Sequence, residues 1–186
     1  MAKTKLALFD LDGTLAETSE ANVEAYRRAF ADQSLAFNQQ VYQGSHGMHW
    51  TQSLPLLHPE GTLEEFNTLR SAKSRHYAQL MALTKPIKPV IDLYNLYEPT
   101  HYRAVVTSAS RANAETILKH LGLTPDLLIA ADDVQRPKPD PEGFLKAMAH
   151  FGIGPEDTII YEDSERGLQA ARASGATVVN VATLLT

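Results

Sequence analysis

Short apolar runs alternate with amphipathic helical patterns along much of the chain, and this alternation predicts its fold. The apolar runs lie at residues 6–9, 103–107, 127–131, 158–161 and 176–181. Each is short and ends at turn-forming or polar residues, as buried strands do. Strands separated by helices indicate βαβ units and a parallel sheet. We therefore expect an α/β protein whose core is a doubly wound, five-stranded, Rossmann-like parallel sheet.

The helical segments between these strands have recognisable ends. Ser110 can cap a helix over residues 111–121, which Gly122 would stop. Asp140 and Pro141 suit the cap and the first position of a further helix. This helix is expected to run to about residue 151, and another is expected over residues 167–174.

Residues 16–87 have a different character, because they show helical patterns and no convincing strand. An apolar face recurs over residues 19–33, and residues 62–65 resemble a capping box that opens a second helix. Residues 44–50 are loop-like, and residues 85–89, with two prolines, form a plausible linker. We expect a catalytic core made of residues 1–15 and 88–186. A helical insert over residues 16–87 would form a second lobe.

Composition and charge limit the possible partners. The 186 residues carry a net charge of −5 with no block of like charge, which argues against nucleic acid as the main partner. No apolar run approaches the ~20 residues that span a bilayer, and the N-terminal stretch is too short and too acidic at its end for a signal peptide. The absence of cysteine excludes disulfides and thiol catalysis. We expect a cytoplasmic protein that does not bind membranes; the sequence does not indicate an oligomeric state.

Polar side chains follow three of the expected strands. They are Asp10 and Asp12 after the first strand, Thr107 and Ser108 after the second, and Glu162 and Asp163 after the fourth. Because parallel strands end at the same edge of a sheet, we expect these side chains to lie close together. Lys138, in a proline-rich loop after the third strand, can place a cation at the same edge.

The charges at this edge predict a metal. Clustered carboxylates raise one another's pKa unless a cation neutralises them, and Mg²⁺ suits a few carboxylates beside a substrate phosphate. Lys138 supplies one fixed positive charge. Ser108 and the backbone amides after it supply donors for phosphate oxygens. The sequence therefore predicts a phosphoryl-transfer site that binds Mg²⁺.

Four motifs, in this order, resemble those of the haloacid dehalogenase (HAD) superfamily. They are Asp-Leu-Asp-Gly-Thr at 10–14, a Thr/Ser strand end at 107–108, Lys138 within Arg-Pro-Lys-Pro-Asp-Pro at 136–141, and Tyr-Glu-Asp-Ser-Glu-Arg-Gly-Leu-Gln-Ala-Ala at 161–171. The resemblance covers nearly the whole chain. The position of the insert is similar to that of the helical cap in the phosphoglycolate phosphatase and β-phosphoglucomutase-like branch.

The resemblance implies a role for each motif residue. Asp10 would be the nucleophile that forms an aspartyl-phosphate. Asp12 would be the general acid for the leaving alcohol and then the base for water, and its backbone carbonyl would touch the metal. Asp163 would complete the Mg²⁺ site, and Glu162 is a candidate for the same role.

The phosphoryl group has its own expected contacts. By the same resemblance, Ser108 and the amide of Ala109 would hold the transferring phosphoryl group, with Thr107 as the alternative by a shift of one residue. Lys138 would neutralise charge between Asp10 and the phosphate.

The HAD scaffold supports several reactions, so the residues must choose between them. Asp12 argues against a dehalogenase, which needs no second aspartate to protonate a leaving group. A β-phosphoglucomutase carries a histidine in the first cap helix and an arginine in a cap loop, where this chain has Asn22 and Gly47. We therefore expect a phosphatase acting on a small phosphorylated metabolite, with a sugar-phosphate mutase as the alternative. A phospho-receiver-like Mg²⁺ switch module, which would place its aspartate later and lack a cap, and a silent binding protein are weaker alternatives.

Choice of substrate is expected to lie in the insert. Thr18 looks like one side of the hinge, and the loop with His46, Gly47 and His49 can face the leaving group in this family. These four are the candidate specificity residues. A zinc site at His46, His49 and His58 is a competing interpretation, but no third ligand has convincing spacing.

Overall fold

The computed structural model describes residues 3–45 and 47–184, and a five-stranded parallel sheet lies at its centre. The strand order is β5-β4-β1-β6-β7. The strands are β1 (Lys5–Phe9), β4 (His101–Val106), β5 (Leu127–Ile129), β6 (Thr158–Glu162) and β7 (Thr177–Asn180). The expected parallel α/β fold is therefore confirmed.

Strand β1 occupies the middle of the sheet because its sequence is apolar on both faces. Leu8 lies between Ala104 of β4 and Ile160 of β6 in the strand register, and all three side chains are fully buried. Burial on both faces is the expected environment of a central parallel strand. This places the polar residues that follow β1 at the centre of the carboxyl edge.

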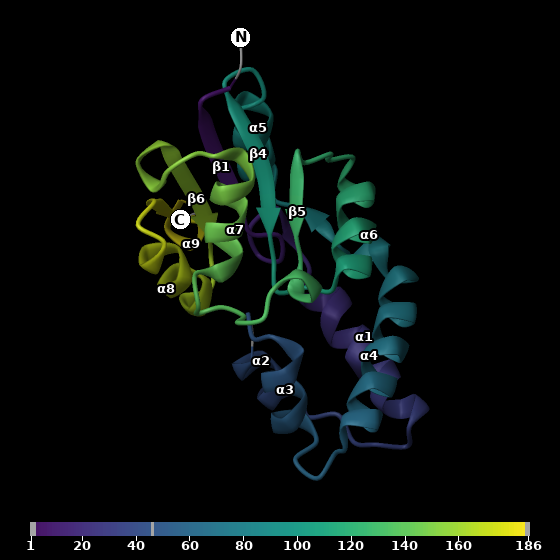
Figure 1. The fold of residues 1–186 in the computed structure, drawn as a ribbon. Coiled ribbons are helices and arrows are strands. Elements are labelled where there is room, and N and C mark those ends of the chain that lie inside the picture. Colours follow the sequence, from purple (N-terminus) through teal and green to yellow (C-terminus); the bar gives the residue numbers. More distant parts are fainter. Residues whose placement is uncertain (1–2, 46, 185–186) are drawn as a thin grey trace.

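Helices cover both faces of the sheet (Figure 1). One apolar cluster joins Leu6 and Leu8 to α7 (Glu142–Phe151) and α8 (Glu165–Ala173). The other joins Phe9 to α5 (Lys88–Leu96), α6 (Arg111–Leu121) and α9 (Val181–Leu184). Successive residues of β1 face opposite sides, as the strand periodicity requires.

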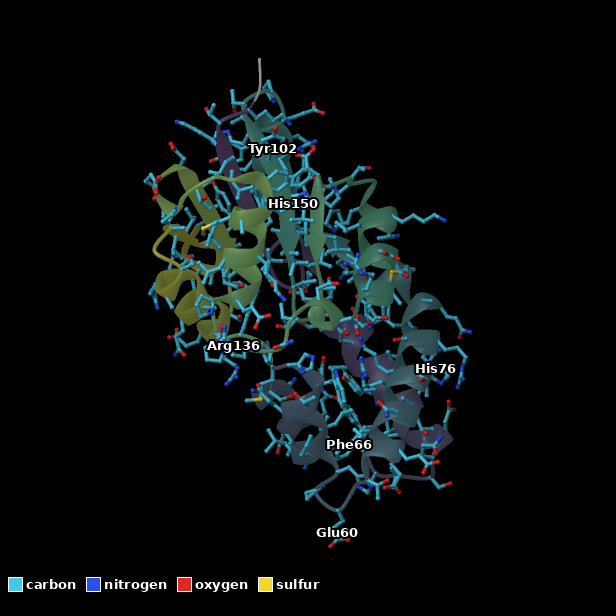
Figure 2. The ribbon with its side chains drawn as sticks, viewed as in Figure 1. Glu60, Phe66, His76, Tyr102, Arg136 and His150 are labelled. Carbon is cyan, nitrogen blue, oxygen red and sulfur yellow. The ribbon has the colours of Figure 1, made fainter. Side chains whose placement is uncertain are left out.

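A separate group of helices lies beyond the carboxyl edge of the sheet; we call it the helical lobe. Its elements are α1 (Ser19–Asp32), α2 (Gln39–Gly44), α3 (Trp50–Leu57), α4 (Leu63–Ala78) and the short η1 (Met81–Leu83). The lobe has its own core, with Phe30, Leu54 and Leu69 fully buried. Phe66 and Glu60 lie in the lobe in Figure 2, at the opposite end of the molecule from Tyr102.

The chain enters and leaves the helical lobe through a short antiparallel ribbon. Strand β2 (Ala16–Glu17) pairs with β3 (Lys85–Pro86), and Ile87 N donates to Leu15 O at 3.0 Å. The ribbon lies near the ends of the expected insert, and the boundary at residues 16–87 stays a prediction. We call the five-stranded sheet with its covering helices α5 to α9 the sheet domain. Two further short helical turns, η2 (Ala131–Asp133) and η3 (Pro155–Asp157), lie in its loops.

Several helix ends match the expectations from sequence. Ser110 accepts a hydrogen bond from Asn113 N, and Gly122 ends α6 in the left-handed region at φ 67°. Thr62 and Glu65 form the reciprocal capping box at the start of α4. The caps at Ser110 and Thr62 depend on side-chain-to-backbone bonds within one turn, and the end at Gly122 depends on its left-handed backbone. Local sequence therefore determines all three.

Other elements differ from the expectations. Helices α2, α3, α5 and α9 were not expected; α2 spans 6 residues, and α3 contains Pro55. The expected strand at 176–181 ends at Asn180, because α9 begins at Val181. Helix α7 begins at Glu142, so Pro141 takes the cap position while Asp140 Oδ1 accepts from Glu142 N at 2.9 Å. No helix within the described residues is long and apolar enough to cross a membrane.

Candidate active site

The carboxyl edge of the sheet brings together residues that are far apart in sequence. Asp10 follows β1 directly, and its amide donates to Tyr161 O at 2.9 Å. Thr107 follows β4, and its amide donates to Ile129 O at 2.9 Å. Both bonds continue the ladder of the sheet past the strand ends. The backbone of each residue is therefore held by the neighbouring strand, which fixes where its side chain starts.

Lys138 joins two of the expected carboxylates. Its Nζ atom lies 2.6 Å from Asp10 Oδ1 and 2.6 Å from Glu162 Oε2, and it also donates to Val106 O at 3.1 Å. The exposed fractions of Asp10, Lys138 and Glu162 are 6%, 8% and 0%. A buried charge network persists when its members are paired and hydrogen-bonded, as here.

The pKa values of both Asp10 and Lys138 are raised. Burial raises the pKa of Asp10 well above its ordinary value, and the neighbouring Glu162 carboxylate adds to this shift. Burial alone would lower the pKa of Lys138, but the Asp10 and Glu162 carboxylates outweigh it and raise that pKa. The lysine therefore stays charged, and the acidic cluster favours a further cation.

Three carboxylates are placed to hold that cation. Asp10, Glu162 and Asp163 each offer an oxygen, and these oxygens lie within 4.8 Å of one another. A cluster of hard oxygen donors fits Mg²⁺. The Asp12 side chain is not part of this group among the described residues, and the expected contact through its backbone carbonyl stays a prediction.

Glu162 is oriented by its own backbone neighbours. Its Oε1 atom accepts from the amides of Asp163 and Ser164 at 3.2 and 3.1 Å and from the Ser164 hydroxyl at 2.8 Å. A Cβ atom at Gly167 would lie 2.0 Å from the Glu162 carboxyl carbon. The glycine of the fourth motif therefore leaves room for this buried carboxylate.

Asp163 is held by the turn that follows β1. Thr14 Oγ1 donates to Asp163 Oδ1 at 2.8 Å. Gly13 has a φ of +87°, and a Cβ atom there would lie 2.2 Å from Asp163 Oδ2. Glycine suits this position both because the backbone is left-handed and because the carboxylate needs the space. The Gly-Thr pair of the first motif thus positions a side chain of the fourth.

Asp12 faces the helical lobe. The Thr18 hydroxyl donates to Asp12 Oδ1, and Asn22 Nδ2 donates to the same oxygen at 3.1 Å. Thr18 is buried and is absent from the described residues that line the main pocket; its hydroxyl donates to Asp12 and accepts from Asn22 at 3.1 Å. The sequence suggested Thr18 as a hinge and specificity residue, and its bond to Asp12 was not predicted.

The segment after β4 presents hydroxyls and an amide beside Asp10. Thr107 Oγ1 accepts from Ala109 N at 3.0 Å, which uses this hydroxyl to shape the turn. Ser108 Oγ donates over a longer 3.4 Å to the carbonyl of Gly47 in the helical lobe. Thr107, Ser108 and Ala109 all line the same pocket as Asp10. The structure therefore brings together the residues expected to contact a phosphoryl group.

A pocket of about 590 Å³ separates this edge from the helical lobe. The lobe contributes polar side chains to it, among them Asn22, Tyr42, Arg70 and Lys73. The guanidinium carbon of Arg70 lies 4.0 Å from the centre of the Trp50 ring, and Arg70 Nη2 lies 3.5 Å from Asp132 Oδ1 of the sheet domain. A pocket of this size with several polar groups suits a small polar ligand.

Lys73 was not among the residues predicted for the site. Only 8% of it is exposed, and its Nζ atom lies 4.2 Å from the centre of the Tyr77 ring. Burial lowers its pKa to about 8, against the opposing effect of Asp12. The detectable signal was a lysine within the helical apolar stripe that includes Leu69 and Tyr77.

The candidate specificity residues of the loop between α2 and α3 lie in different surroundings. Gly47 lines the pocket, and a Cβ atom there would lie 3.0 Å from Ser164 Cβ. His49 caps α3 through Thr51 and lines a smaller cavity, while His46 lies outside the described residues. The acidic cluster found among the described residues contains neither His49 nor His58. The competing zinc interpretation includes His46, so it stays untested.

The fold and the acidic site define an α/β enzyme. The chain belongs to the haloacid dehalogenase-like hydrolase family, whose model matches residues 7–181. The resemblance indicated by the motifs is thereby confirmed.

Individual relatives agree with this family. The chain is 30% identical over 179 residues to the fructose-1-phosphate phosphatase YqaB of Escherichia coli, covering 94% of each protein. It is 27% identical over 187 residues to a β-phosphoglucomutase of Bacillus subtilis, covering 95% of this chain and 83% of that protein. The crystal structure of CbbY from Rhodobacter sphaeroides in complex with phosphate superposes with a TM-score of 0.85 at 25% identity, covering 94% of this chain and 84% of that one. These similarities support a phosphoric monoester hydrolase.

Proposed function

We propose that the protein is a Mg²⁺-dependent phosphatase that hydrolyses a small phosphate monoester through an aspartyl-phosphate on Asp10. One observation carries the proposal. The buried Asp10 is paired with Lys138 and lies beside Asp163, at the wall of a pocket shared with the helical lobe. A nucleophilic carboxylate, a fixed cation and a metal-binding oxygen cluster are the parts that phosphoryl transfer requires.

The first step transfers the phosphoryl group to the enzyme. A carboxylate oxygen of Asp10 bonds to phosphorus as the bond to the leaving oxygen breaks. Asp12 donates a proton to that oxygen, so the product leaves as an alcohol. The hydrogen bonds from Thr18 and Asn22 hold the Asp12 carboxyl group toward the lobe, where the leaving group would lie.

The second step returns the enzyme to its starting state. Asp12, now a carboxylate, takes a proton from water as the water oxygen bonds to phosphorus. The bond between phosphorus and Asp10 breaks, which releases inorganic phosphate and restores both carboxyl groups. Water is the final acceptor in this sequence, so the overall reaction is hydrolysis.

The transferring phosphoryl oxygens need donors. The Ser108 hydroxyl and the Ala109 amide are the proposed donors, with the Thr107 hydroxyl as the alternative. The Ala109 amide donates to Thr107 Oγ1 in the structure and would exchange that bond for a phosphoryl oxygen. Lys138 adds a fixed charge that needs no rearrangement during the reaction.

The acidic cluster is proposed to hold Mg²⁺. Asp10 and Asp163, with Glu162 and the backbone carbonyl of Asp12, would be its protein contacts. When bound, the ion supplies positive charge that offsets the carboxylates and the phosphate.

Residues 16–87 are proposed to act as a cap that selects the leaving group. Gly47 and His49 lie on the side of the lobe that faces the sheet, and Asn22, Arg70 and Lys73 supply polar groups to the pocket. Because this lining offers several hydrogen-bond donors, we favour sugar and polyol phosphates, in keeping with the name of the Escherichia coli relative. The cytoplasmic location expected from the sequence stays a prediction.

A sugar-phosphate mutase is the second candidate, favoured by the similarity to a β-phosphoglucomutase. Against it, Asn22 donates its amide to Asp12, and an amide cannot serve as an acid or base at neutral pH. The helical lobe over the site also argues against a receiver-like switch.

A panel of phosphate esters with Mg²⁺ tests the proposal, with Asp10→Asn and EDTA as controls. We expect repeated turnover, lost in both controls, and incorporation of phosphate on Asp10. Free phosphate should account for all substrate consumed; an isomeric sugar phosphate in its place would favour the mutase. No release above the Asp10→Asn control on any ester would overturn the proposal.

A further inference from the structure

Arg166 connects the helical lobe to the loop that carries Lys138. It is the second residue of α8, and its side chain is half-buried. Its Nη2 atom donates to Gln52 Oε1 of α3 at 2.8 Å and to the backbone carbonyl of Lys138 at 3.0 Å. Arg136 marks this loop in Figure 2, where the sheet domain meets the lobe.

The acceptors of this arginine are both neutral. Its Nε atom is buried with no hydrogen-bond partner among the described residues. Removing the Gln52 contact would take one of the two acceptors from Nη2 and leave the guanidinium held by the Lys138 carbonyl alone. The bond from Arg166 to Gln52 therefore forms only when the helical lobe is docked against the sheet domain.

Arg166 also belongs to the framework around Lys138. The Lys138 side chain pairs with Glu162, which accepts from the amide and hydroxyl of Ser164. Ser164 caps the helix that carries Arg166. The side chain and the backbone carbonyl of Lys138 are thus both held from the start of α8, and Arg166 supplies the bond to the backbone.

We propose that Arg166 is a positioning residue. It couples the docking of the helical lobe against the sheet domain to the position of Lys138. When the lobe is docked, Gln52 orients the guanidinium of Arg166. The guanidinium then holds the Lys138 backbone in the position from which Nζ bonds to Asp10. The other hydrogen bonds and ion pairs described between the lobe and the sheet domain, Arg70–Asp132, Ser108–Gly47 and Asn22–Asp12, do not include Lys138. The inference rests on the proposed phosphatase function for its kinetic consequence.

Steady-state kinetics test the coupling in Arg166→Met, Gln52→Ala and the double variant. We expect kcat to fall roughly ten- to a hundredfold in Arg166→Met, with KM changed less than about threefold, because a displaced catalytic group costs turnover rather than binding. Gln52→Ala should have a smaller effect in the same direction. The double variant should resemble Arg166→Met, because both substitutions break one connection. Arg166→Lys should recover part of the loss.

Arg172→Met is the matched control. Arg172 lies on the same helix and is exposed, and its side chain forms a 3.9 Å ion pair with Glu165. It should keep the wild-type kcat. Wild-type kcat in Arg166→Met, or a double variant whose loss is the product of the two single losses, would overturn the inference.

Hydrogen–deuterium exchange supplies a readout that does not need turnover. The amides of Arg136, Lys138 and Asp140 should exchange faster in both Arg166→Met and Gln52→Ala, and at the wild-type rate in Arg172→Met. Unchanged exchange in Gln52→Ala would contradict the coupling even in an active enzyme. Absence of turnover in the wild type, with faster exchange in both variants, would remove the proposed function and leave the connection in place.

Discussion

The ammonium group of Lys138 lies 2.6 Å from a carboxylate oxygen of Asp10, although 128 residues separate the two in sequence. The same ammonium group bonds to Glu162 and to the end of β4. One side chain therefore ties together the ends of three adjacent strands, β4, β1 and β6. The geometry of the site depends on this lysine as much as on the acids that it neutralises.

Replacing this lysine should affect both stability and activity. Lys138→Met leaves Asp10 and Glu162 buried without their cation, so we expect a loss of about 3–5 kcal/mol in the free energy of unfolding at pH 7. The turnover number should fall by at least about a hundredfold. Urea denaturation in EDTA and steady-state kinetics measure the two effects. Lys88→Met removes an exposed pair with Asp92 and should cost less than about 1 kcal/mol; equal losses in the two variants would contradict the argument.

The close contact between Gly13 and Asp163 predicts a defect in metal binding. In Gly13→Ala the new methyl group must displace the Asp163 carboxylate, so the Mg²⁺ concentration for half-maximal activity should rise by about tenfold or more. Gly122→Ala is the control, since Gly122 is also left-handed at φ +67° but faces open space. It should lose about 1 kcal/mol of stability and keep its Mg²⁺ dependence. A similar Mg²⁺ response in both variants would remove Asp163 from the proposed metal site.

Substrates with different leaving groups can distinguish the acid role of Asp12 from its base role. Asp12→Asn cannot protonate an alcohol, but 4-nitrophenolate leaves without a proton. We expect a burst of about one 4-nitrophenol per enzyme, followed by slow turnover because the base for water is missing. With an alkyl phosphate, release of the first alcohol should itself slow by about 10²–10⁴-fold. Equal slowing of the first turnover on both esters would show that Asp12 is not the acid.

Lys73 should give the stability an alkaline pH dependence. Its folded pKa of about 8 lies below the ordinary 10.5, so between these values the unfolded chain binds the extra proton. Unfolding then takes up a proton, and stability rises with pH across this window. Lys73→Met should lack this rise and gain stability at pH 7, on the order of 3 kcal/mol at most.

Thermal unfolding from pH 7 to 10.5 measures this effect. Lys119→Met, at an exposed position on α6, should retain the rise. Turnover should fall in Lys73→Met if the lysine contacts the leaving group. The stability lost by burying this charge would then serve substrate binding. Parallel stability curves for the wild type and Lys73→Met would contradict the lowered pKa.

Local signals in the sequence predicted much of the fold. The apolar runs identified five strands, and the caps at Ser110 and Thr62 placed two helices, because both kinds of signal act within a few residues. The short helix α2 and the proline-containing α3 were missed, although Asn38 and His49 cap them. Helices this short carry little pattern of their own and depend on contacts elsewhere in the chain. Helix α9 was missed for another reason: its first residue, the apolar Val181, continues the apolar pattern of the preceding strand.

The chemical parts of the site follow from the order of residues along the chain. Parallel strands must end at one edge, so the positions of Asp10, Thr107 and Glu162 directly after or at the ends of apolar runs already imply that they meet. The order and spacing of the motifs then indicated the family, which the comparisons confirmed.

The orientation of these parts depends on the folded molecule. Thr18 and Asn22 bond to Asp12, Gly13 makes room for Asp163, and Lys73 enters the pocket as a buried cation. Arg166 lies between the lobe and Lys138. Strand periodicity and helix caps arise from neighbours in sequence, whereas these contacts arise only in the folded molecule, most of them where the lobe is packed onto the sheet. No local pattern encodes that packing, because it depends on the shape and charge of two surfaces together.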